Sequence, residues 1–405
     1  MSTNSSLQSY VFSGLDGTLL VKRAIPSDSI SVCSTAMLNV RGGQSIKVPG
    51  TGALAHHPNA HLSPTSEPYR HWRNDSSVFF CDVVTSQESD HPICLRKKLR
   101  CLEKMLQSRG VTVRFGIEIE FTAAPKISHG PALHAPQLMS DLGMHRSSSF
   151  LAEEALDRIL KKGEYVGIKW YSAGREFFPN QFEVSLGPMT ATELAEQFLL
   201  AKEVITSEFS RVGWSTSFMP LPNNGSVGNG CHINVSLEKN HASTIKAGGV
   251  ASSLASDIKR YTGFFNPSVN SFRRLDLDDF RGMQDLGDHR HCMIRVLEKD
   301  NARLELRTPD AMMNVYAALL AVLFSVNRAI FEVNDADEES FLFPDNLTTC
   351  ITRLKKLTKF KSCLGDVFYD AFVDMLEHQD KFYKKTVSPV DFLLLEPRNI
   401  LTENQ

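Results

Sequence analysis

Acidic side chains embedded in apolar, strand-like runs constrain this chain more than any other feature of its sequence. Glu118 and Glu120 lie two residues apart in RFGIEIEF, and this spacing in a strand directs both carboxylates to the same face. The remaining members of the set follow in comparable segments and are Glu176, Glu183, His232 and Glu305. Charge in or beside a core is costly unless cations balance it. The sequence therefore predicts a cation site on a buried sheet.

Length and composition indicate a large globular protein. The chain has 405 residues, 42% of them hydrophobic and 22% charged, which is enough for one large domain and a smaller one. The formal net charge of -2 gives no reason to expect nucleic acid or an anionic membrane as partner, so we expect small-molecule partners. The longest apolar run, Val315 to Val326, is shorter than the ~20 residues that cross a bilayer. It predicts a buried helix.

The cysteines and the polar N-terminal segment indicate the compartment. Eight cysteines are scattered without CxxC pairs, and no apolar signal segment follows MSTNSSLQSY. We therefore expect reduced cysteines and a cytoplasmic protein.

The residue composition and pattern of the chain change after about the first hundred residues. Short β-favouring runs such as SYVFSG and SSVFFCDVV, separated by turn residues, predict a small β-rich domain over residues 1–92, with a long loop around VRGGQSIKVPGTGALAHHPNAHLSPTSEP. Residues 93–405 alternate strands and helices. Thr190 followed by Glu193 is a capping-box signature for a helix that runs to Gly213. The predicted fold class is α+β.

Hard divalent cations prefer carboxylate oxygen, and Mg²⁺ keeps positions open for water and phosphate. Five carboxylates and one imidazole suffice for two such ions with three protein ligands each. Two adjacent ions can clamp a nucleotide phosphate during phosphoryl transfer. Several arginines accompany them, and alternation along a strand would send Arg303, Glu305 and Arg307 to one face. Guanidinium groups bind phosphate or carboxylate through paired hydrogen bonds. The pattern thus predicts a two-metal site that handles phosphate.

The order of these segments resembles the glutamine synthetase superfamily. The matching motifs, between about Pro92 and Tyr316, are GIEIEF, E-x6-E with QFEV, GxGxH, NPSVNSFRRL, R-x4-R and RLELRTPD. The resemblance implies a small β-grasp-like N-terminal domain and a catalytic domain whose curved antiparallel sheet is flanked by helices. It also implies ATP, two Mg²⁺ or Mn²⁺ ions, and a homo-oligomeric ring, hexameric or dodecameric, with sites between subunits. The implied reaction activates a carboxylate as an acyl phosphate, which an amine then attacks.

The resemblance assigns roles to individual residues. It implies one metal held by Glu120, Glu176 and Glu183, and a second held by Glu118, His232 and Glu305. It places Arg274 and Arg307 on the substrate carboxylates and Gly228 beside the amino-acid substrate. Arg290, Arg295 and Arg303 would face the phosphates, and Ser236 the nucleotide.

The sequence departs from the family in places that bear on the amine. The region that matches the family's acidic latch reads TGALAHHPNAHLSP, without an aspartate, and an ammonium site needs anionic partners. The flap after FRRL is shorter, and Asp278 or Asp279 could replace its acid; we assign Asp279 the catalytic role. Asn234 stands in place of the second histidine of HxH. Val227 replaces an asparagine of the glycine-rich loop, and Asp300 replaces a basic residue.

These departures leave alternatives open. The first hypothesis is an ATP-dependent ligase that joins glutamate or a related acid to an amine other than ammonia. The second is an ordinary glutamine synthetase, and the third is a catalytically silent relative with a structural or regulatory role. A phosphagen kinase would lack the glutamate-rich metal set. An ATP-grasp ligase is disfavoured because NNGSVGNG has no following lysine.

Overall fold

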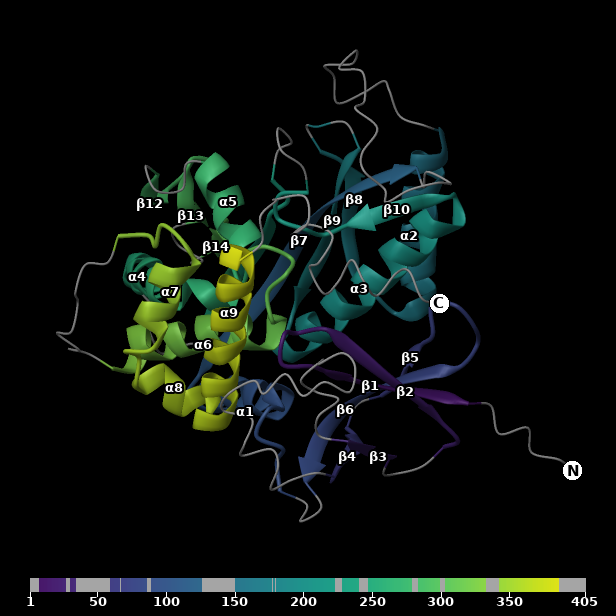
Figure 1. Cartoon of the computed structure of the whole chain (residues 1–405), viewed down its shortest axis with the longest axis horizontal. Coiled ribbons are helices and arrows are strands. Elements are labelled where there is room, and N and C mark those ends of the chain that lie inside the picture. The colour runs from purple at the N-terminus through teal and green to yellow at the C-terminus, as the bar shows by residue number, and fades with distance from the viewer. Residues whose placement is uncertain are drawn as a thin grey trace, which may run out of the picture.

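The computed structural model describes residues 7–26, 30–33, 59–65, 67–85, 89–125, 150–176, 178, 180–222, 228–239, 247–278, 283–298, 303–332 and 342–385. Two β-sheets and a set of flanking helices make up this part of the chain (Figure 1). The α+β fold class predicted from the sequence is confirmed.

The N-terminal β domain forms the first sheet. Its strands are β1 (Gln8–Ser13), β2 (Leu19–Ala24), β3 (Ile30–Cys33), β4 (Asn59–Pro64), β5 (Tyr69–Arg70) and β6 (Ser77–Thr85). They are ordered β2-β1-β6-β4-β3, with β5 on β6; β1 and β6 run parallel, and the other pairs are antiparallel. The runs SYVFSG and SSVFFCDVV fall on β1 and β6, as predicted. Strand β4 lies within the stretch predicted as a long loop, because its pairing with β3 and β6 outweighs its weak local β-propensity.

The second sheet is built around one long strand. Its strands are β7 (Val111–Pro125), β8 (Trp170–Arg175), β9 (Gln181–Met189), β10 (Trp214–Ser217), β11 (Cys231–Lys239), β12 (Gln284–Gly287), β13 (Cys292–Glu298) and β14 (Arg303–Leu306). The order is β12-β13-β14-β11-β7-β9-β8, with β10 also on β7. Along β7, the odd-numbered residues from Val111 to Ala123 are buried and the even-numbered ones are half-buried. This alternation gives β7 one face for the core and one face for the acidic side chains.

Helices cover the sheet and close the fold. They are α1 (Leu95–Ser108), α2 (Phe150–Val166), α3 (Ala191–Arg211), α4 (Ala247–Phe265), α5 (Val269–Leu277), α6 (Val315–Phe331), α7 (Leu347–Leu354), α8 (Lys359–Leu364) and α9 (Asp366–Lys385). The Thr190 side chain accepts a hydrogen bond from the backbone N–H of Glu193, so the predicted start of α3 is confirmed. Helix α6 is almost entirely buried and packs against α4 and α1. Within the described residues, no helix is long and apolar enough to cross a membrane.

A buried ionic network joins the N-terminal sheet to helices α1 and α3. Arg96 of α1 contacts Asp82 of β6 through Nη1 at 2.8 Å and Glu196 of α3 through Nη2 at 2.5 Å. All three side chains are 5–6% exposed. Arg100 adds a 2.5 Å contact to Asp82. Since each buried carboxylate has a guanidinium partner, the network offsets its desolvation cost and holds the N-terminal sheet against the catalytic part.

Candidate active site

The pairing registers of four strands bring five of the six predicted ligands together. On β7, Glu118 lies directly across from His232 of β11, and Glu120 lies across from Glu183 of β9. On the far side of β11, Asn234 lies across from Glu305 of β14. Directly opposed residues of an antiparallel pair have Cβ atoms about 4.5–5.5 Å apart. The register alone therefore gathers side chains that are separated by up to 187 residues in the sequence.

The ligand-type atoms form two groups. Glu118, His232 and Glu305 form the first, which we call the histidine cluster, and Glu120, Glu176 and Glu183 form the second, the glutamate cluster; in each, one ligand atom per residue lies within 4.8 Å of the others. These are the same two triplets that the family resemblance implied. Glu176 joins the glutamate cluster from the end of β8, just before the turn that leads to β9.

His232 belongs to the histidine cluster and also approaches the glutamate cluster. Its Nδ1 is 3.1 Å from Glu118 Oε2 and 3.4 Å from Glu305 Oε1, and its Nε2 is 3.7 Å from Glu120 Oε1. Asn234, which stands where the family has a second histidine, donates from Nδ2 to Glu118 Oε1 at 2.9 Å. The two clusters are therefore adjacent parts of one acidic surface on the sheet.

Crowded carboxylates shift the proton affinities within this surface. Burial raises the pKa of Glu183 to about 7, and repulsion from Glu118, Glu176 and Glu120 adds to the effect. Burial also opposes ionisation of Glu118, but hydrogen bonds from His232 and Asn234 bring the pKa of this carboxyl below its usual value. For His232, burial acts to lower the pKa, and the contacts with Glu118 and Glu120 outweigh it and raise the pKa.

The donor set fits a hard divalent cation. Five carboxylates and one imidazole match the ligands that Mg²⁺ and Mn²⁺ prefer. Burial and the neighbouring carboxylates both raise the pKa of Glu183, and a bound cation would favour its ionised form. The residues present therefore fit two divalent ions, one in each cluster.

A glycine shapes the edge of the glutamate cluster. The backbone N–H of Gly230 donates to Glu120 Oε2 at 2.6 Å. A Cβ atom at this position would lie 2.8 Å from His232 Nε2 and 3.4 Å from Glu120 Oε2. Only glycine leaves this space open. The sequence reasoning used the GxGxH motif for family matching and missed this contact, although the glycine spacing was the signal for it.

The arginines predicted to bind phosphate or carboxylate differ in their burial and in their contacts with the acidic surface. Arg295 of β13 approaches Glu305 Oε2 with Nη1 at 3.3 Å, and Arg307 contacts Glu305 Oε1 through Nη1. Arg290, in the turn before β13, and Arg303, at the start of β14, are exposed and lie outside the two clusters. Ser236 is half-buried on β11, two residues beyond Asn234. Arg295 and Arg307 thus contact the acidic surface through Glu305.

Two of the residues assigned to the acid substrate, Arg274 and Gly228, are buried beside each other. Arg274 is 1% exposed, and its guanidinium donates to the carbonyl oxygens of Pro309 and Arg307. Gly228 packs on its stem, since a Cβ there would meet Arg274 Cγ at 2.2 Å. Asp278 caps the end of α5, whereas Asp279 lies outside the described residues.

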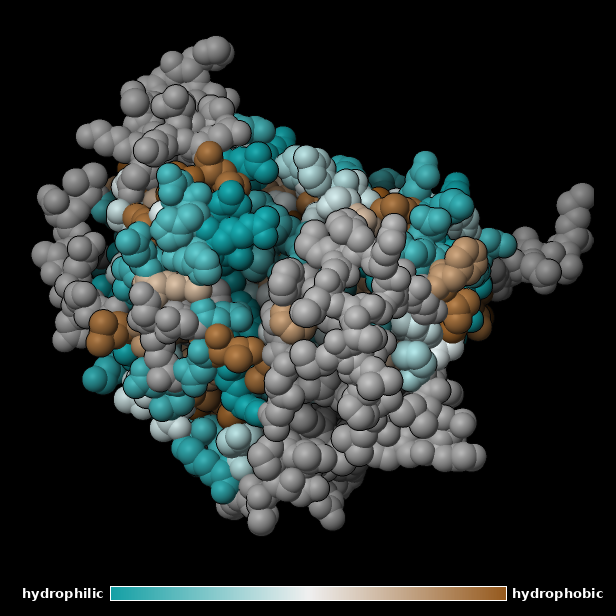
Figure 2. All heavy atoms as spheres, turned by 90° about the horizontal axis from the view of Figure 1, so that it is seen from above, coloured by the Kyte–Doolittle hydropathy of each residue, from teal (hydrophilic) through white to brown (hydrophobic). Residues whose placement is uncertain are grey.

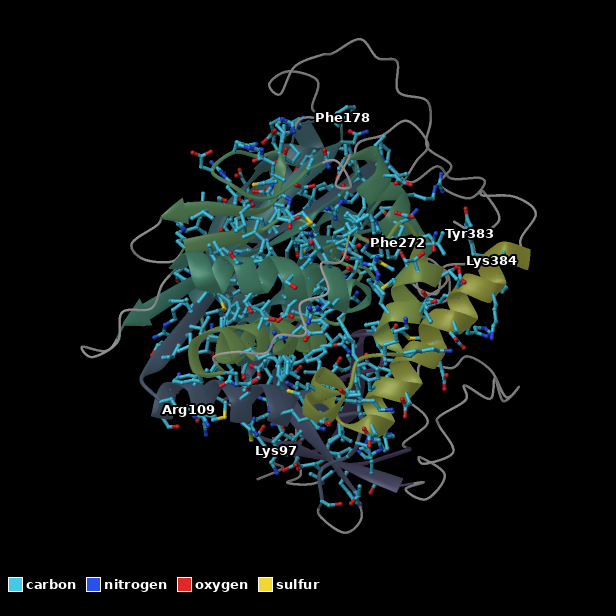
Figure 3. The ribbon with its side chains drawn as sticks, turned by 90° about the vertical axis from the view of Figure 1, so that its left-hand side faces the viewer. Lys97, Arg109, Phe178, Phe272, Tyr383 and Lys384 are labelled. Atoms are coloured by element: carbon cyan, nitrogen blue, oxygen red, sulfur yellow. The ribbon has the colours of Figure 1, made fainter. Side chains whose placement is uncertain are left out.

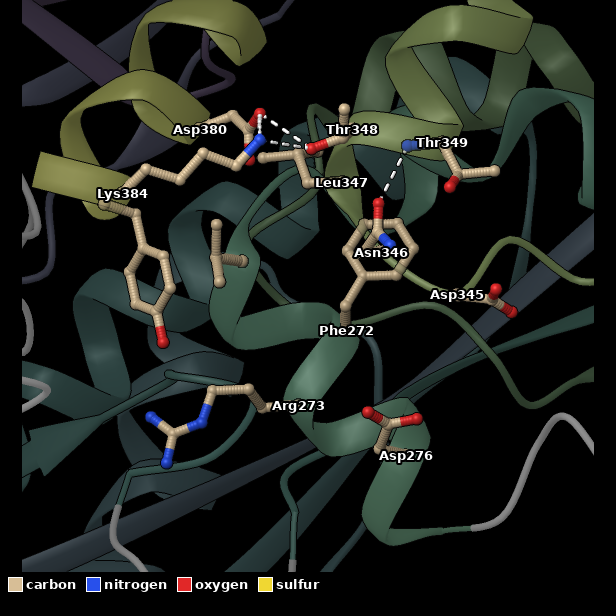
Figure 4. A pocket seen from close by; sticks show the side chains of 12 residues that line it. Phe272, Arg273, Asp276, Asp345, Asn346, Leu347, Thr348, Thr349, Asp380 and Lys384 are labelled. Atoms are coloured by element: carbon tan, nitrogen blue, oxygen red, sulfur yellow. Dashed lines mark hydrogen bonds and ion pairs between the residues drawn. The ribbon is translucent and has the colours of Figure 1, made fainter.

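A separate cleft opens on the outer side of α5. Its volume is about 540 Å³, and it is lined by Val269, Phe272, Arg273, Asp276, Asp345, Asn346, Leu347, Thr348, Thr349, Asp380, Tyr383 and Lys384. Figures 3 and 4 show Phe272 of α5 on the same side of the molecule as Lys384 of α9. Lys384 is already paired with Asp380 at 2.7 Å. None of the lining residues belongs to the two clusters, so the cleft is distinct from the acidic surface.

On the face seen from above, the described residues are mostly hydrophilic, and apolar residues occur as small, separated patches between them (Figure 2). The cysteines whose side chains the structure describes are free thiols.

A largely antiparallel sheet that carries two adjacent acidic clusters, beside a small N-terminal β domain, defines a recognisable class of α+β enzyme. The model of the family "Glutamine synthetase, catalytic domain" matches residues 92–395. The chain belongs to this family, and it is an ATP-dependent ligase of the glutamine synthetase superfamily. Members of the family use ATP and a divalent metal.

Relatives and solved structures agree with this assignment. A glutamine synthetase of Thermococcus kodakarensis is 26% identical over 325 residues, which cover 72% of this chain and 71% of the relative. A glutamine synthetase of Staphylococcus aureus is 26% identical over 344 residues, covering 76% of each chain. A novel glutamine synthase homolog aligns with a TM-score of 0.76 at 17% identity, over 98% of this chain and 99% of its own. The GmaS/ADP complex aligns with a TM-score of 0.74 at 19% identity, over 95% of both chains.

Proposed function

We propose that this protein joins the γ-carboxylate of glutamate, or of a related acid, to an amine other than ammonia at the expense of ATP. A carboxylate oxygen of the acid attacks the γ-phosphorus of ATP, and ADP leaves. The amine nitrogen then attacks the acyl carbon of the resulting acyl phosphate, loses a proton, and expels inorganic phosphate. The products are an amide, ADP and phosphate.

The observation that carries this proposal is the pair of adjacent clusters around His232. We assign one Mg²⁺ or Mn²⁺ ion to Glu118, His232 and Glu305, and a second to Glu120, Glu176 and Glu183, because each triplet offers three ligand atoms within 4.8 Å. Two such ions, when bound, neutralise charge on the transferring phosphoryl group.

We assign the protein groups around the two clusters to the binding of phosphate, carboxylate and nucleotide. Arg295 and Arg307, which touch Glu305, are close enough to the histidine cluster to bind phosphate or carboxylate oxygen. We assign Arg290 and Arg303 to the outer phosphates and Ser236 to the nucleotide, by their match to the family pattern. Pre-positioned cations of this kind stabilise the phosphoryl group mainly by electrostatics.

Two features support an amine other than ammonia. The latch-like region lacks an aspartate: β4 (Asn59–Pro64), its described part, reads NAHLSP. At the end of α5, Asp278 is engaged with Arg274 at 3.1 Å. A cationic ammonium would find fewer anionic partners in such a site than in a site with both acids. The competing hypothesis, a true glutamine synthetase, is favoured by the names of the curated relatives.

A substrate panel separates the two hypotheses. Phosphate release is measured with ATP, Mg²⁺ and glutamate against ammonia, alkylamines, polyamines and anilines, and the amides are identified by mass spectrometry. We expect kcat/KM for the best organic amine to exceed that for ammonia by at least tenfold. Equal or faster turnover with ammonia would overturn the amine assignment and favour glutamine synthetase.

Binding measurements test the hypothesis that the protein is a catalytically silent relative. A catalytically active member should gain thermal stability from ATP and from Mn²⁺, because each ligand binds the folded state. The variant Glu183→Gln serves as the matched control for metal binding. If neither ligand raises Tm of the wild-type protein, a structural or regulatory role replaces the enzymatic one. Size measurement by light scattering would test the proposed hexameric or dodecameric ring.

A further inference from the structure

Arg274 is a buried connector between three segments of the catalytic domain. It lies in the last turn of α5, donates from Nη1 to the Pro309 carbonyl oxygen at 2.8 Å and from Nη2 to the Arg307 carbonyl oxygen at 3.0 Å. Its aliphatic stem fills the space beside Gly228, where a Cβ would be 2.2 Å from Cγ and 2.9 Å from Cδ. With 1% exposure, this side chain has little freedom to reorient.

The segments that Arg274 joins carry members of the acidic surface. Arg307 and Pro309 follow β14, which bears Glu305. The Pro309 carbonyl oxygen also accepts from the Cys231 N–H at 2.9 Å, and Cys231 directly precedes His232. A displacement of the guanidinium therefore reaches β11 and β14, two of the three strands that carry the histidine cluster.

The buried carboxylate of Asp310 lies near Arg274 but accepts hydrogen bonds from other groups. Asp310 accepts from Asn266 Nδ2 at 2.9 Å and from the Met312 N–H at 3.0 Å. The carboxylate that contacts the third donor of the guanidinium, Nε, is Asp278 at 3.1 Å. Residues at i and i+4 lie on one face of a helix, so the C-cap of α5 aims Asp278 along the same face as Arg274.

We propose that Asp278 is a positioning residue that orients Arg274, rather than the acid that takes the proton of the amine. Its carboxylate holds the guanidinium against the carbonyl oxygens of residues 307 and 309, and through them keeps Glu305 and Arg307 in place for the acid substrate. The role in catalysis rests on the proposed ligase function. The structural role of the pair does not, because the contacts belong to the protein alone.

Kinetics of Asp278→Asn test the role in catalysis. The asparagine keeps the shape of the side chain and removes its charge. We expect KM for the acid substrate to rise at least fivefold, whereas the pH dependence of kcat/KM for the amine keeps its shape. Asp278→Glu should recover part of the affinity. The matched control is Asp276→Asn, which removes an acid from the outer, cleft-lining side of the same helix and should change KM less than twofold.

The opposite kinetic result would overturn the proposal. If Asp278 takes the proton of the amine, Asp278→Asn abolishes one limb of the pH profile and lowers kcat, with KM for the acid unchanged. An effect of Asp276→Asn equal to that of Asp278→Asn would also overturn it, since it would show a general effect of charge on α5.

Hydrogen exchange tests the structural role without turnover. The N–H groups of Cys231 and Arg307 each donate a 2.9 Å hydrogen bond, to the carbonyl oxygens of Pro309 and Met293 respectively. We expect amide exchange at these two N–H groups to be at least tenfold faster in Asp278→Asn than in Asp276→Asn. Unchanged exchange would refute the positioning role, even if the protein proved inactive with every amine. Inactivity of the wild-type protein combined with faster exchange would defeat the proposed ligase function alone and leave the Asp278–Arg274 pairing established.

Discussion

Glu183→Gln is the substitution for which the structure yields the most quantitative prediction. Glu183 sits among other carboxylates of the acidic surface, and its pKa is about 7 instead of 4.5. Between these two pH values the unfolded chain loses the proton of this carboxyl while the folded protein retains it. The free energy of unfolding of the metal-free protein therefore falls as pH rises through this window, and the full cost is present above about pH 7.

The magnitude follows from the distance between the two pKa values. At about 1.4 kcal/mol per pH unit, holding Glu183 ionised in the metal-free protein costs about 3 kcal/mol. Glutamine is uncharged, so the Glu183→Gln variant does not carry this free-energy cost. Glu183→Gln should match the wild-type protein near pH 4.5 and exceed its stability by up to about 3 kcal/mol at pH 8, or roughly 5 °C in Tm for a domain of this size.

With Mn²⁺ bound, the wild-type protein should be more stable than Glu183→Gln. A divalent cation binds the ionised carboxylate, so the stabilisation of the wild-type protein by Mn²⁺ should grow as pH rises from 5 to 8. Glu183→Gln should lose most of this response because one of three ligands is neutral.

The assay is thermal or urea unfolding at several pH values, with and without Mn²⁺. Glu238→Gln is the matched control, because Glu238 is an exposed glutamate of β11 paired with Arg114 at 3.5 Å. It should stay within ~0.5 kcal/mol of wild type. A stability difference between Glu183→Gln and wild type that does not widen with pH would refute the reasoning, as would an unaltered Mn²⁺ response in the variant.

Three further substitutions probe other parts of the molecule. Arg96→Met should lower the free energy of unfolding by about 3–5 kcal/mol in urea titrations, because the buried Glu196 loses its guanidinium partner and Asp82 loses one of its two; a loss below 1 kcal/mol would contradict this. Asn234→Ala should weaken Mn²⁺ binding about 10–100-fold by calorimetry, because Glu118 loses its orienting donor, and unchanged affinity would show that Asn234 does not position the ligand. Gly228→Ala should lower kcat/KM at least tenfold, because the new methyl group displaces Arg274; a fully active variant would mean that this stem can move without consequence.

Local sequence patterns predicted the elements that carry the site. The alternation in RFGIEIEF predicted a strand with both glutamates on one face, and β7 has this arrangement. The Thr190 cap and the apolar run in α6 likewise predicted their helices, because capping and hydrophobic periodicity depend on neighbours within a few residues. The order of motifs was also sufficient to recognise the family.

Contacts between distant segments were harder to predict. Strand β4 has a weak local signal and forms through its pairing with β3 and β6. The motif match placed Arg274 on the substrate, but it could not reveal that the side chain is 1% exposed and holds two carbonyl oxygens. The same motif match gave Arg290, Arg295 and Arg303 one role, but it could not reveal that Arg290 and Arg303 are exposed while Arg295 contacts Glu305.

The sequence by itself determined which residue types are available, on which faces of which strands they lie, and hence the family and the kind of chemistry. The tertiary structure supplied the geometry of the grouping that the resemblance had implied: the registers of β7 with β9 and β11, and of β11 with β14, bring five ligand-type side chains together, and Glu176 joins them from the end of β8. The physical reason is that strand alternation is a local property of the backbone, whereas register and burial result from the packing of the whole sheet.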